Sequence, residues 1–157
     1  MKKIYLTPFL FLPLLLFTGC SKDFLKRYDK RIQGAWQLVD VDRIGWGGST
    51  SSVPFREGTF TFAEDGQLEY TNGAGDIYQG AWDIRRDWVR NQCYTNEDGD
   101  SDCDDRYVHS MHVTAVNFTT QEVRTEYFDE VIFTATNRFK AYVYTGSRSY
   151  VFRFRRR

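Results

Sequence analysis

The sequence lacks a net charge and is poor in cysteine and proline, and each shortage excludes a class of protein. Its 157 residues carry 21 basic and 21 acidic side chains, so nothing general attracts nucleic acid, and none is expected as a partner. Three cysteines are too few for a small disulfide scaffold. Aromatic residues make up 17% of the chain, which argues against disorder. The length fits one folded domain.

Catalytic signatures are also missing from the sequence. The motifs H-E-x-x-H, G-x-S-x-G and the P-loop do not occur. Asp40 and Asp42 share one face of a predicted strand, but such pairs also occur on solvent-facing strands. His109 and His112 stand at an odd spacing, so their side chains point to opposite faces of a strand and do not readily bind one metal. We therefore expect a protein that is not an enzyme.

Residues 1–19 have the pattern of an export signal. Lys2 and Lys3 precede an apolar run from Leu6 to Phe17, which is too short to span a bilayer. The following Thr18-Gly19-Cys20 resembles the lipobox of bacterial lipoproteins. This resemblance implies cleavage before Cys20 and acylation of its thiol, with palmitate as one of the acyl groups. The alternative is an ordinary secretory signal followed by an incidental cysteine.

Cleavage before Cys20 would leave 138 residues, with a charge-rich stretch at 20–31 as a lipidated tether and the folded domain at 32–157. Ser21-Lys22-Asp23 resembles export tags that send some lipoproteins to the outer face of the outer membrane. We expect a location in the bacterial cell envelope, anchored in the outer membrane by lipid, on its periplasmic or surface face.

The composition after Cys20 favours strands. Only three leucines and one proline remain, whereas valine, isoleucine, threonine and aromatic residues are abundant. Phe60 and Phe62 alternate with threonines, and a Glu-Asp-Gly turn separates them from the alternating Leu68 and Tyr70.

Further strands are predicted along the chain. The predicted strand segments are Tyr78–Ile84, Trp88–Tyr94 after a turn at Arg85–Asp87, Tyr107–Phe118, Val123–Tyr127, Val131–Phe133 beyond an irregularity at Asp129–Glu130, Phe139–Thr145 and Tyr150–Phe154, with a turn at Gly146-Ser147. About eight to ten short strands predict an antiparallel barrel or sandwich.

Two similar segments suggest a more specific fold. Gly34-Ala35-Trp36 opens the first predicted strand, and Gly80-Ala81-Trp82 repeats the pattern. A glycine two residues before a tryptophan lets another backbone or ring pack closely, although both tryptophans could be ordinary core residues. With a long loop and a train of hairpins, this layout resembles the lipocalin-like β-barrel domains of bacterial lipoproteins.

The resemblance implies an all-β, antiparallel up-and-down lipocalin-like barrel. In lipocalins an arginine near the end of the barrel packs over the first-strand tryptophan, and Arg153 and Arg155 are the candidates here. It also implies that a small apolar or amphiphilic ligand binds inside. The candidate ligand-lining residues are Trp46, Phe60, Phe62, Tyr70 and Tyr78, with Trp46 in the Gly45–Val53 loop either covering the ligand or folding onto the core. The alternative function is a structural or protein-interaction domain of an envelope complex.

An acidic loop at 93–105 contains the remaining two cysteines. In an oxidising compartment, with Cys20 acylated, Cys93 and Cys103 are expected to form a disulfide. Free or metal-bound thiols are the alternatives. The alternating Asp98, Asp100, Asp102 and Asp104 resemble the start of a calcium loop but lack the EF-hand glycine and glutamate, so calcium is the one candidate cofactor and a solvated hairpin tip is the alternative.

The end of the chain is basic, with seven basic and no acidic residues from Val131 to Arg157. Anionic lipid headgroups or lipopolysaccharide are plausible partners of such a segment in the envelope. The alternative is a last strand with its polar face in water.

Overall fold

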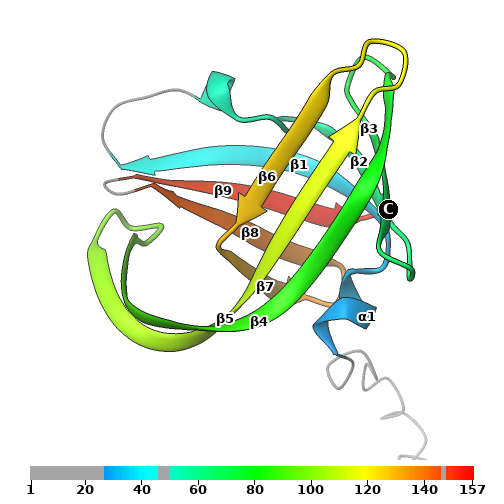
Figure 1. Ribbon diagram of the computed structural model, residues 1–157. Helices are drawn as coiled ribbons and strands as arrows, with labels where there is room; N and C mark the ends of the chain where they lie inside the picture. The colour runs from blue at the N-terminus through cyan, green and yellow to red at the C-terminus, as the bar shows by residue number, and fades with distance from the viewer. Residues whose placement is uncertain (1–26, 46–49, 146–147) are drawn as a thin grey trace, which may run out of the picture.

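The structure is a computed structural model that describes residues 27–45, 50–145 and 148–157. It confirms an all-β protein in which nine strands form one antiparallel sheet of order β6-β5-β4-β3-β2-β1-β9-β8-β7 (Figure 1). The elements are α1 (Tyr28–Ile32), β1 (Gly34–Gly45), the 3-10 turn η3 (Thr50–Ser52), β2 (Gly58–Phe62), β3 (Gln67–Thr71), β4 (Ile77–Thr95), β5 (Ser101–Val116), β6 (Val123–Phe128), β7 (Glu130–Ala135), β8 (Arg138–Thr145) and β9 (Arg148–Arg156).

The sheet curls strongly, but its ladder of hydrogen bonds does not close, which corrects the expectation of a closed barrel. The two edge strands, β6 and β7, are consecutive in the chain and separated by Asp129 alone. β6 pairs with β5, whereas β7 pairs with β8, and the backbone N–H of Asp129 donates to Tyr142 O at 2.8 Å. The predicted irregularity is thus the point where the chain changes its partner. The edge that ends in β6 and the edge that ends in β7 diverge at Asp129, so these two strands do not pair with each other.

The inside of the curled sheet holds one continuous core. Alternation along each strand sends every second side chain inward, as Phe60 and Phe62 in β2 and Phe152 and Phe154 in β9 show. All four are at most 2% exposed and belong to a cluster that runs from α1 to β9. Full burial of one such side chain contributes about 1.5–3 kcal/mol, so this core is the main source of stability.

β4 and β5 continue well beyond the core as a long hairpin, and the turn predicted at Arg85–Asp87 does not exist. β4 runs unbroken for 19 residues, and residues 85–89 pair in regular register with β5. The polar residues that suggested a turn are strand residues, of which Arg85 and Arg86 are exposed and Asp87 is half-buried. A strand outside the core needs no apolar face. We call residues 86–108 the arm. A register shift between Val89 and Gln92, with Asn91 at φ +44°, bends it.

A short helix occupies the end of the expected tether. α1 covers residues 28–32 and is fixed to the sheet, because Ile32 is fully buried and the Tyr28 ring stacks on His109 with centroids 3.5 Å apart. Residues 28–31, which were predicted as the end of the tether, are therefore part of a helix that packs on the sheet. No helix within the described ranges is long and apolar enough to cross a membrane.

Candidate functional site

The residues predicted to line a ligand cavity lie in the core. Phe60, Phe62, Tyr70 and Tyr78 are each at most 1% exposed. Their rings contact one another, with centroids 4.6 Å apart for Phe60 and Tyr70 and 5.5 Å for Tyr70 and Tyr78. The space between these strands is therefore occupied by the protein's own aromatic side chains. Trp46 lies outside the described residues.

A pocket of about 450 Å³ opens at the end of the sheet opposite α1. It lies between residues 53–57, the β3–β4 turn and the start of β6. Arg124 crosses it: its guanidinium lies 4.7 Å from the Tyr78 ring centroid and donates to Pro54 O at 3.2 Å. Glu122 accepts hydrogen bonds from Tyr78 Oη at 2.7 Å and Arg124 Nε at 2.9 Å, and these two bonds lower the pKa of its carboxyl.

Both glycine–tryptophan segments build the core. Trp36 Nε1 donates to Ile32 O at 2.6 Å and Trp82 Nε1 donates to Ala63 O at 3.0 Å, so each buried indole has a partner. A Cβ on Gly80 would lie 1.9 Å from the Thr114 carbonyl oxygen, so the close backbone approach expected for Gly80 is present. Gly34 adopts φ +106°, in the left-handed region that favours glycine.

The arginine that covers the first-strand tryptophan is Arg156, and neither Arg153 nor Arg155 does so. The Arg156 guanidinium lies 4.5 Å from the Trp36 ring centroid and donates to Arg31 O at 2.7 Å. The reason is the alternation of β9: Phe152 and Phe154 face the core, so the next inward position is 156.

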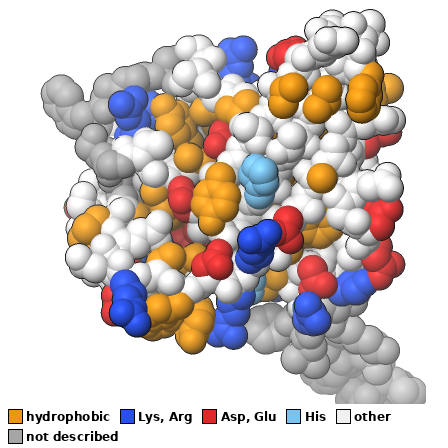
Figure 2. All heavy atoms as spheres, viewed as in Figure 1, with side chains coloured by type: hydrophobic (Ala, Val, Ile, Leu, Met, Phe, Trp, Pro, Cys, Tyr) orange, Lys and Arg blue, Asp and Glu red, His pale blue; other side chains and the backbone are white. Residues whose placement is uncertain are grey.

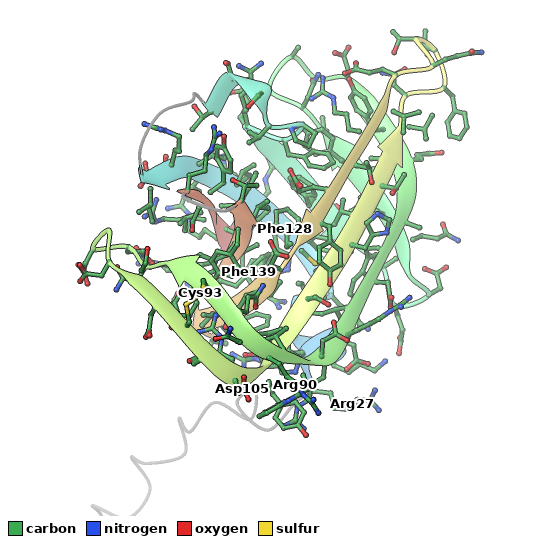
Figure 3. The ribbon with its side chains drawn as sticks, turned by 60° about the vertical axis from the view of Figure 1, so that its left-hand side comes forward. Arg27, Arg90, Cys93, Asp105, Phe128 and Phe139 are labelled. Atoms are coloured by element: carbon green, nitrogen blue, oxygen red, sulfur yellow. A yellow bond between two sulfur atoms is a disulfide. The ribbon has the colours of Figure 1, made fainter. Side chains whose placement is uncertain are left out.

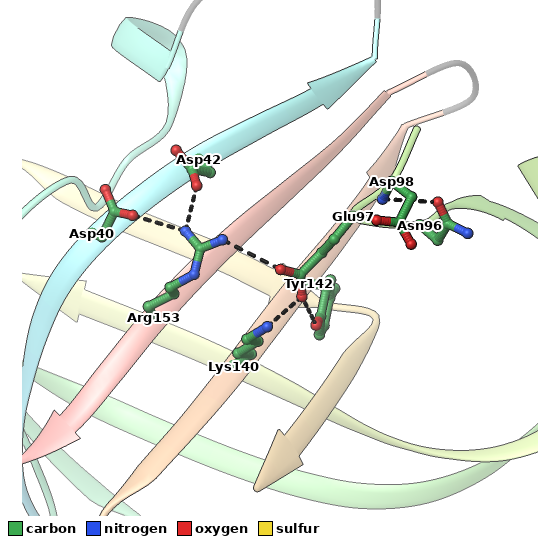
Figure 4. Close-up of polar contacts among 8 residues, drawn as sticks. All are labelled: Asp40, Asp42, Asn96, Glu97, Asp98, Lys140, Tyr142 and Arg153. Carbon is green, nitrogen blue, oxygen red and sulfur yellow. Dashed lines mark hydrogen bonds and ion pairs between the residues drawn. The ribbon is translucent and has the colours of Figure 1, made fainter. Parts of the chain in front are cut away.

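The tip of the arm, which is the acidic loop at 93–105, folds back over the outer face of β8 and β9 and is held there by ion pairs (Figure 4). Arg153 binds Asp40 at 2.8 Å, is also paired with Asp42, and reaches Glu97 of the tip at 3.4 Å. Glu97 in turn accepts hydrogen bonds from Lys140 and Tyr142. The bond from Lys140, followed by that from Tyr142, lowers the pKa of Glu97. We call these six residues the clamp.

Behind the clamp the arm covers a second, more buried group. Arg106 forms an ion pair with Glu130 at 2.6 Å, and Tyr144 Oη donates to the same carboxylate at 2.7 Å. Burial and this hydrogen bond raise the pKa of Tyr144. Val108 and Val151 are at most 2% exposed although they lie outside the interior cluster. The arm therefore has a packed contact with the sheet as well as ionic ones.

The acidic tip contains the predicted disulfide. Cys93 and Cys103 face each other across the arm with an S–S distance of 2.02 Å, which confirms the pairing. Asp98 and Asp100 lie in the turn, and their backbone N–H groups donate to Asn96 Oδ1. Asp104 is 3.6 Å from Arg106. Within the described residues no three His, Cys, Asp or Glu side chains gather as a metal site, so calcium binding stays a prediction.

Sequence reasoning missed the partners of several polar residues. Asp40 and Asp42 face Arg153 instead of forming an acid–base pair. His109 and His112 do not share a site: His109 stacks on Tyr28, and His112 lies within 3.2 Å of Thr125 Oγ1. Burial, followed by the nearby Arg86, lowers the pKa of His109. No motif could have revealed the contacts of Asp40, Asp42 and His109, because their partners are distant in sequence.

Apolar side chains are exposed at the end of the sheet opposite α1. Ile77 of β4, Phe118 after β5 and Val123 of β6 are 55%, 73% and 61% exposed. Strand pairing brings these segments together. Val116, two residues before Phe118, pairs with Val123 on one side and with Gln79, two residues after Ile77, on the other. Figure 2 shows hydrophobic side chains gathered along this edge, over the β5–β6 turn. We call these three residues the distal cluster.

Comparison with protein-family models, with curated proteins and with solved structures finds no match to this chain.

Proposed function

We propose that this is a lipid-anchored protein of the bacterial cell envelope whose lipocalin-like domain acts as a protein-interaction module. The lipobox-like Thr18-Gly19-Cys20 supports the anchor, and the Arg156–Trp36 contact supports the lipocalin-like assignment. The observation that carries the function is the distal cluster. Three large apolar side chains exposed together at one end of a domain mark a contact site for another protein.

A filled core favours this function over a ligand held inside. The aromatic rings between the strands already contact one another, and close-packed protein interiors leave few voids larger than a water molecule. Binding at the outer surface requires no rearrangement of that core.

The test is photo-crosslinking in native envelopes, with a reactive amino acid placed at Phe118. We expect one dominant partner, recovered in constant ratio, and its loss on Val123→Ser. Tyr127→Ser is the matched control, because Tyr127 is half exposed on the same strand but lies outside the distal cluster. Equal crosslinking in Val123→Ser and the parent protein would contradict the proposal.

A small amphiphilic ligand in the open pocket is the second candidate. Val53 and Val123 offer apolar contacts, and Arg124 offers a cation beside them. Native mass spectrometry of protein from its own host tests this function. A bound molecule that disappears with Arg124→Gln is the expected result. Protein that is ligand-free both before and after this substitution would exclude it.

A further inference from the structure

We propose that the α1 end of the domain carries a membrane-contact patch, made of Trp88 and Tyr107 flanked by Arg27, Arg86 and Arg90, that rests on the anionic bilayer surface. This proposal rests on the proposed lipid anchor and goes further by naming the face of the domain that contacts the lipid. We call these five residues the contact patch.

The two aromatic rings are exposed where the arm leaves the core. Trp88 and Tyr107 pair across β4 and β5 with ring centroids 4.6 Å apart, yet they are 47% and 59% exposed. Tryptophan and tyrosine carry a polar group on an apolar ring, and they concentrate at membrane–water interfaces for that reason.

Arginines flank this aromatic pair. Arg86 and Arg90 alternate with Trp88 along β4, and all three are exposed. The Arg86 guanidinium lies 4.1 Å from the Tyr107 ring centroid. Neither arginine forms an ion pair with any described residue, whereas Arg27 pairs with Asp29 at 3.2 Å. Two acids are neighbours of the β4 arginines: Asp87 follows Arg86 in the chain, and Asp105 accepts the Asn91 N–H at 2.6 Å. Unpaired surface arginines attract anionic headgroups.

The anchor enters at this same end. Arg27, together with Tyr28, Arg86 and His109, lines one pocket beside α1, and Figure 3 shows Arg27 and Arg90 at the same lower end of the molecule. Cys20 is seven residues before Arg27, and seven extended residues span at most about 25 Å. An acylated Cys20 therefore restricts this face to the vicinity of the bilayer, while the distal cluster lies at the opposite end (Figure 1).

The experiment uses the acylated protein reconstituted in vesicles of phosphatidylethanolamine and phosphatidylglycerol with brominated acyl chains, which quench nearby tryptophan. We expect quenching in the parent protein that is absent in Trp88→Phe. In Arg86→Gln/Arg90→Gln it should weaken, because each lost charge reduces surface partitioning about fivefold. Phe118→Trp in the Trp88→Phe background is the matched control at the far end and should stay unquenched.

Three outcomes would overturn the contact patch. The first is Trp88 fluorescence that brominated lipid does not quench. The second is quenching of the same strength in the parent protein and in Arg86→Gln/Arg90→Gln. The third is shielding of Trp88 in native membranes but not in pure lipid, which would indicate a protein contact instead. Mass spectrometry of Cys20 in the same sample tests the anchor separately. If Cys20 is unmodified, the anchor is wrong, and the difference in quenching between the parent protein and Trp88→Phe on titration with brominated vesicles still tests the contact patch.

Discussion

The core inside the sheet and the arm outside it are stabilised by different forces. The core joins aromatic side chains such as Trp36, Phe60 and Phe154, all at most 2% exposed, and contains few charges. The disulfide joins the two strands of the arm to each other, and the clamp and the Arg106–Glu130 pair hold the arm against the sheet. Salt screens exposed ion pairs and acid protonates their carboxylates, whereas neither weakens the burial of uncharged side chains. The arm should therefore open under conditions that leave the core intact.

The sharpest test compares one residue type in the two regions. Trp36→Ala should lower the free energy of unfolding by about 3–5 kcal/mol, because it leaves a large cavity in the core. Trp88→Ala, on the exposed arm, should cost less than about 1 kcal/mol. Urea unfolding followed by circular dichroism measures both, and similar losses for the two variants would refute the distinction.

Removal of the disulfide should loosen the pairing between the two strands of the arm without unfolding the core. Cys93→Ser/Cys103→Ser opens a loop of separation 10, which is worth about 2–3 kcal/mol by loop entropy. Hydrogen exchange should accelerate at residues 88–106, with unchanged protection in β2 and β3. Faster exchange throughout the sheet would mean that the arm and the core unfold as one unit.

Acid should release the clamp. The folded pKa of Glu97 lies below its ordinary value of 4.5, so its contribution is complete above that value and is lost as the pH falls through the folded pKa. Because about a third of the side chain is exposed, the effect should stay below about 1 kcal/mol.

NMR titration of the Lys140 and Tyr142 signals measures this loss. Glu97→Gln should remove the transition, whereas Glu69→Gln, on an exposed position of β3, should leave it unchanged. A titration that persists in Glu97→Gln would assign it to another carboxyl group.

Calcium should have the smallest effect of all. A ligand stabilises by RT ln(1 + [L]/Kd), so calcium bound at the predicted loop would raise the midpoint of thermal unfolding. We expect at most a small rise in millimolar calcium relative to chelator, and Asp100→Asn should abolish it. The same midpoint with calcium and with chelator would refute the predicted calcium loop.

Local sequence rules predicted most strands but failed where the core ends. Alternation placed β2 and β3 because one face of each is buried, at Phe60 and Tyr70. It also placed β6, although the alternating Val123 and Tyr127 lie on the exposed face of that strand. The same rule failed at Arg85–Asp87, where β4 has left the core and has no apolar face to repeat. The polar sequence there is typical of a turn, but backbone pairing with β5 continues through these residues and keeps them in a strand.

The candidate sites followed the same division. The Cys93–Cys103 pair was predictable, because the cysteines are near in sequence and the hairpin sets them opposite each other. The clamp was not, because Asp40, Glu97 and Arg153 come from three distant segments. Long-range ion pairs depend on how the arm bends, and no local pattern encodes that direction.

The sequence by itself determined the strand-rich composition, the inward positions of most strands, the disulfide and the export-signal pattern. Each of these depends on residue type, on a period of two or on near neighbours. Only the tertiary structure decided that β6 and β7 stay unpaired with each other, that Arg156 covers Trp36 and that aromatic rings fill the inside of the sheet. These features depend on how much the whole sheet curls, because that curl sets which distant side chains meet and how much space is left between them.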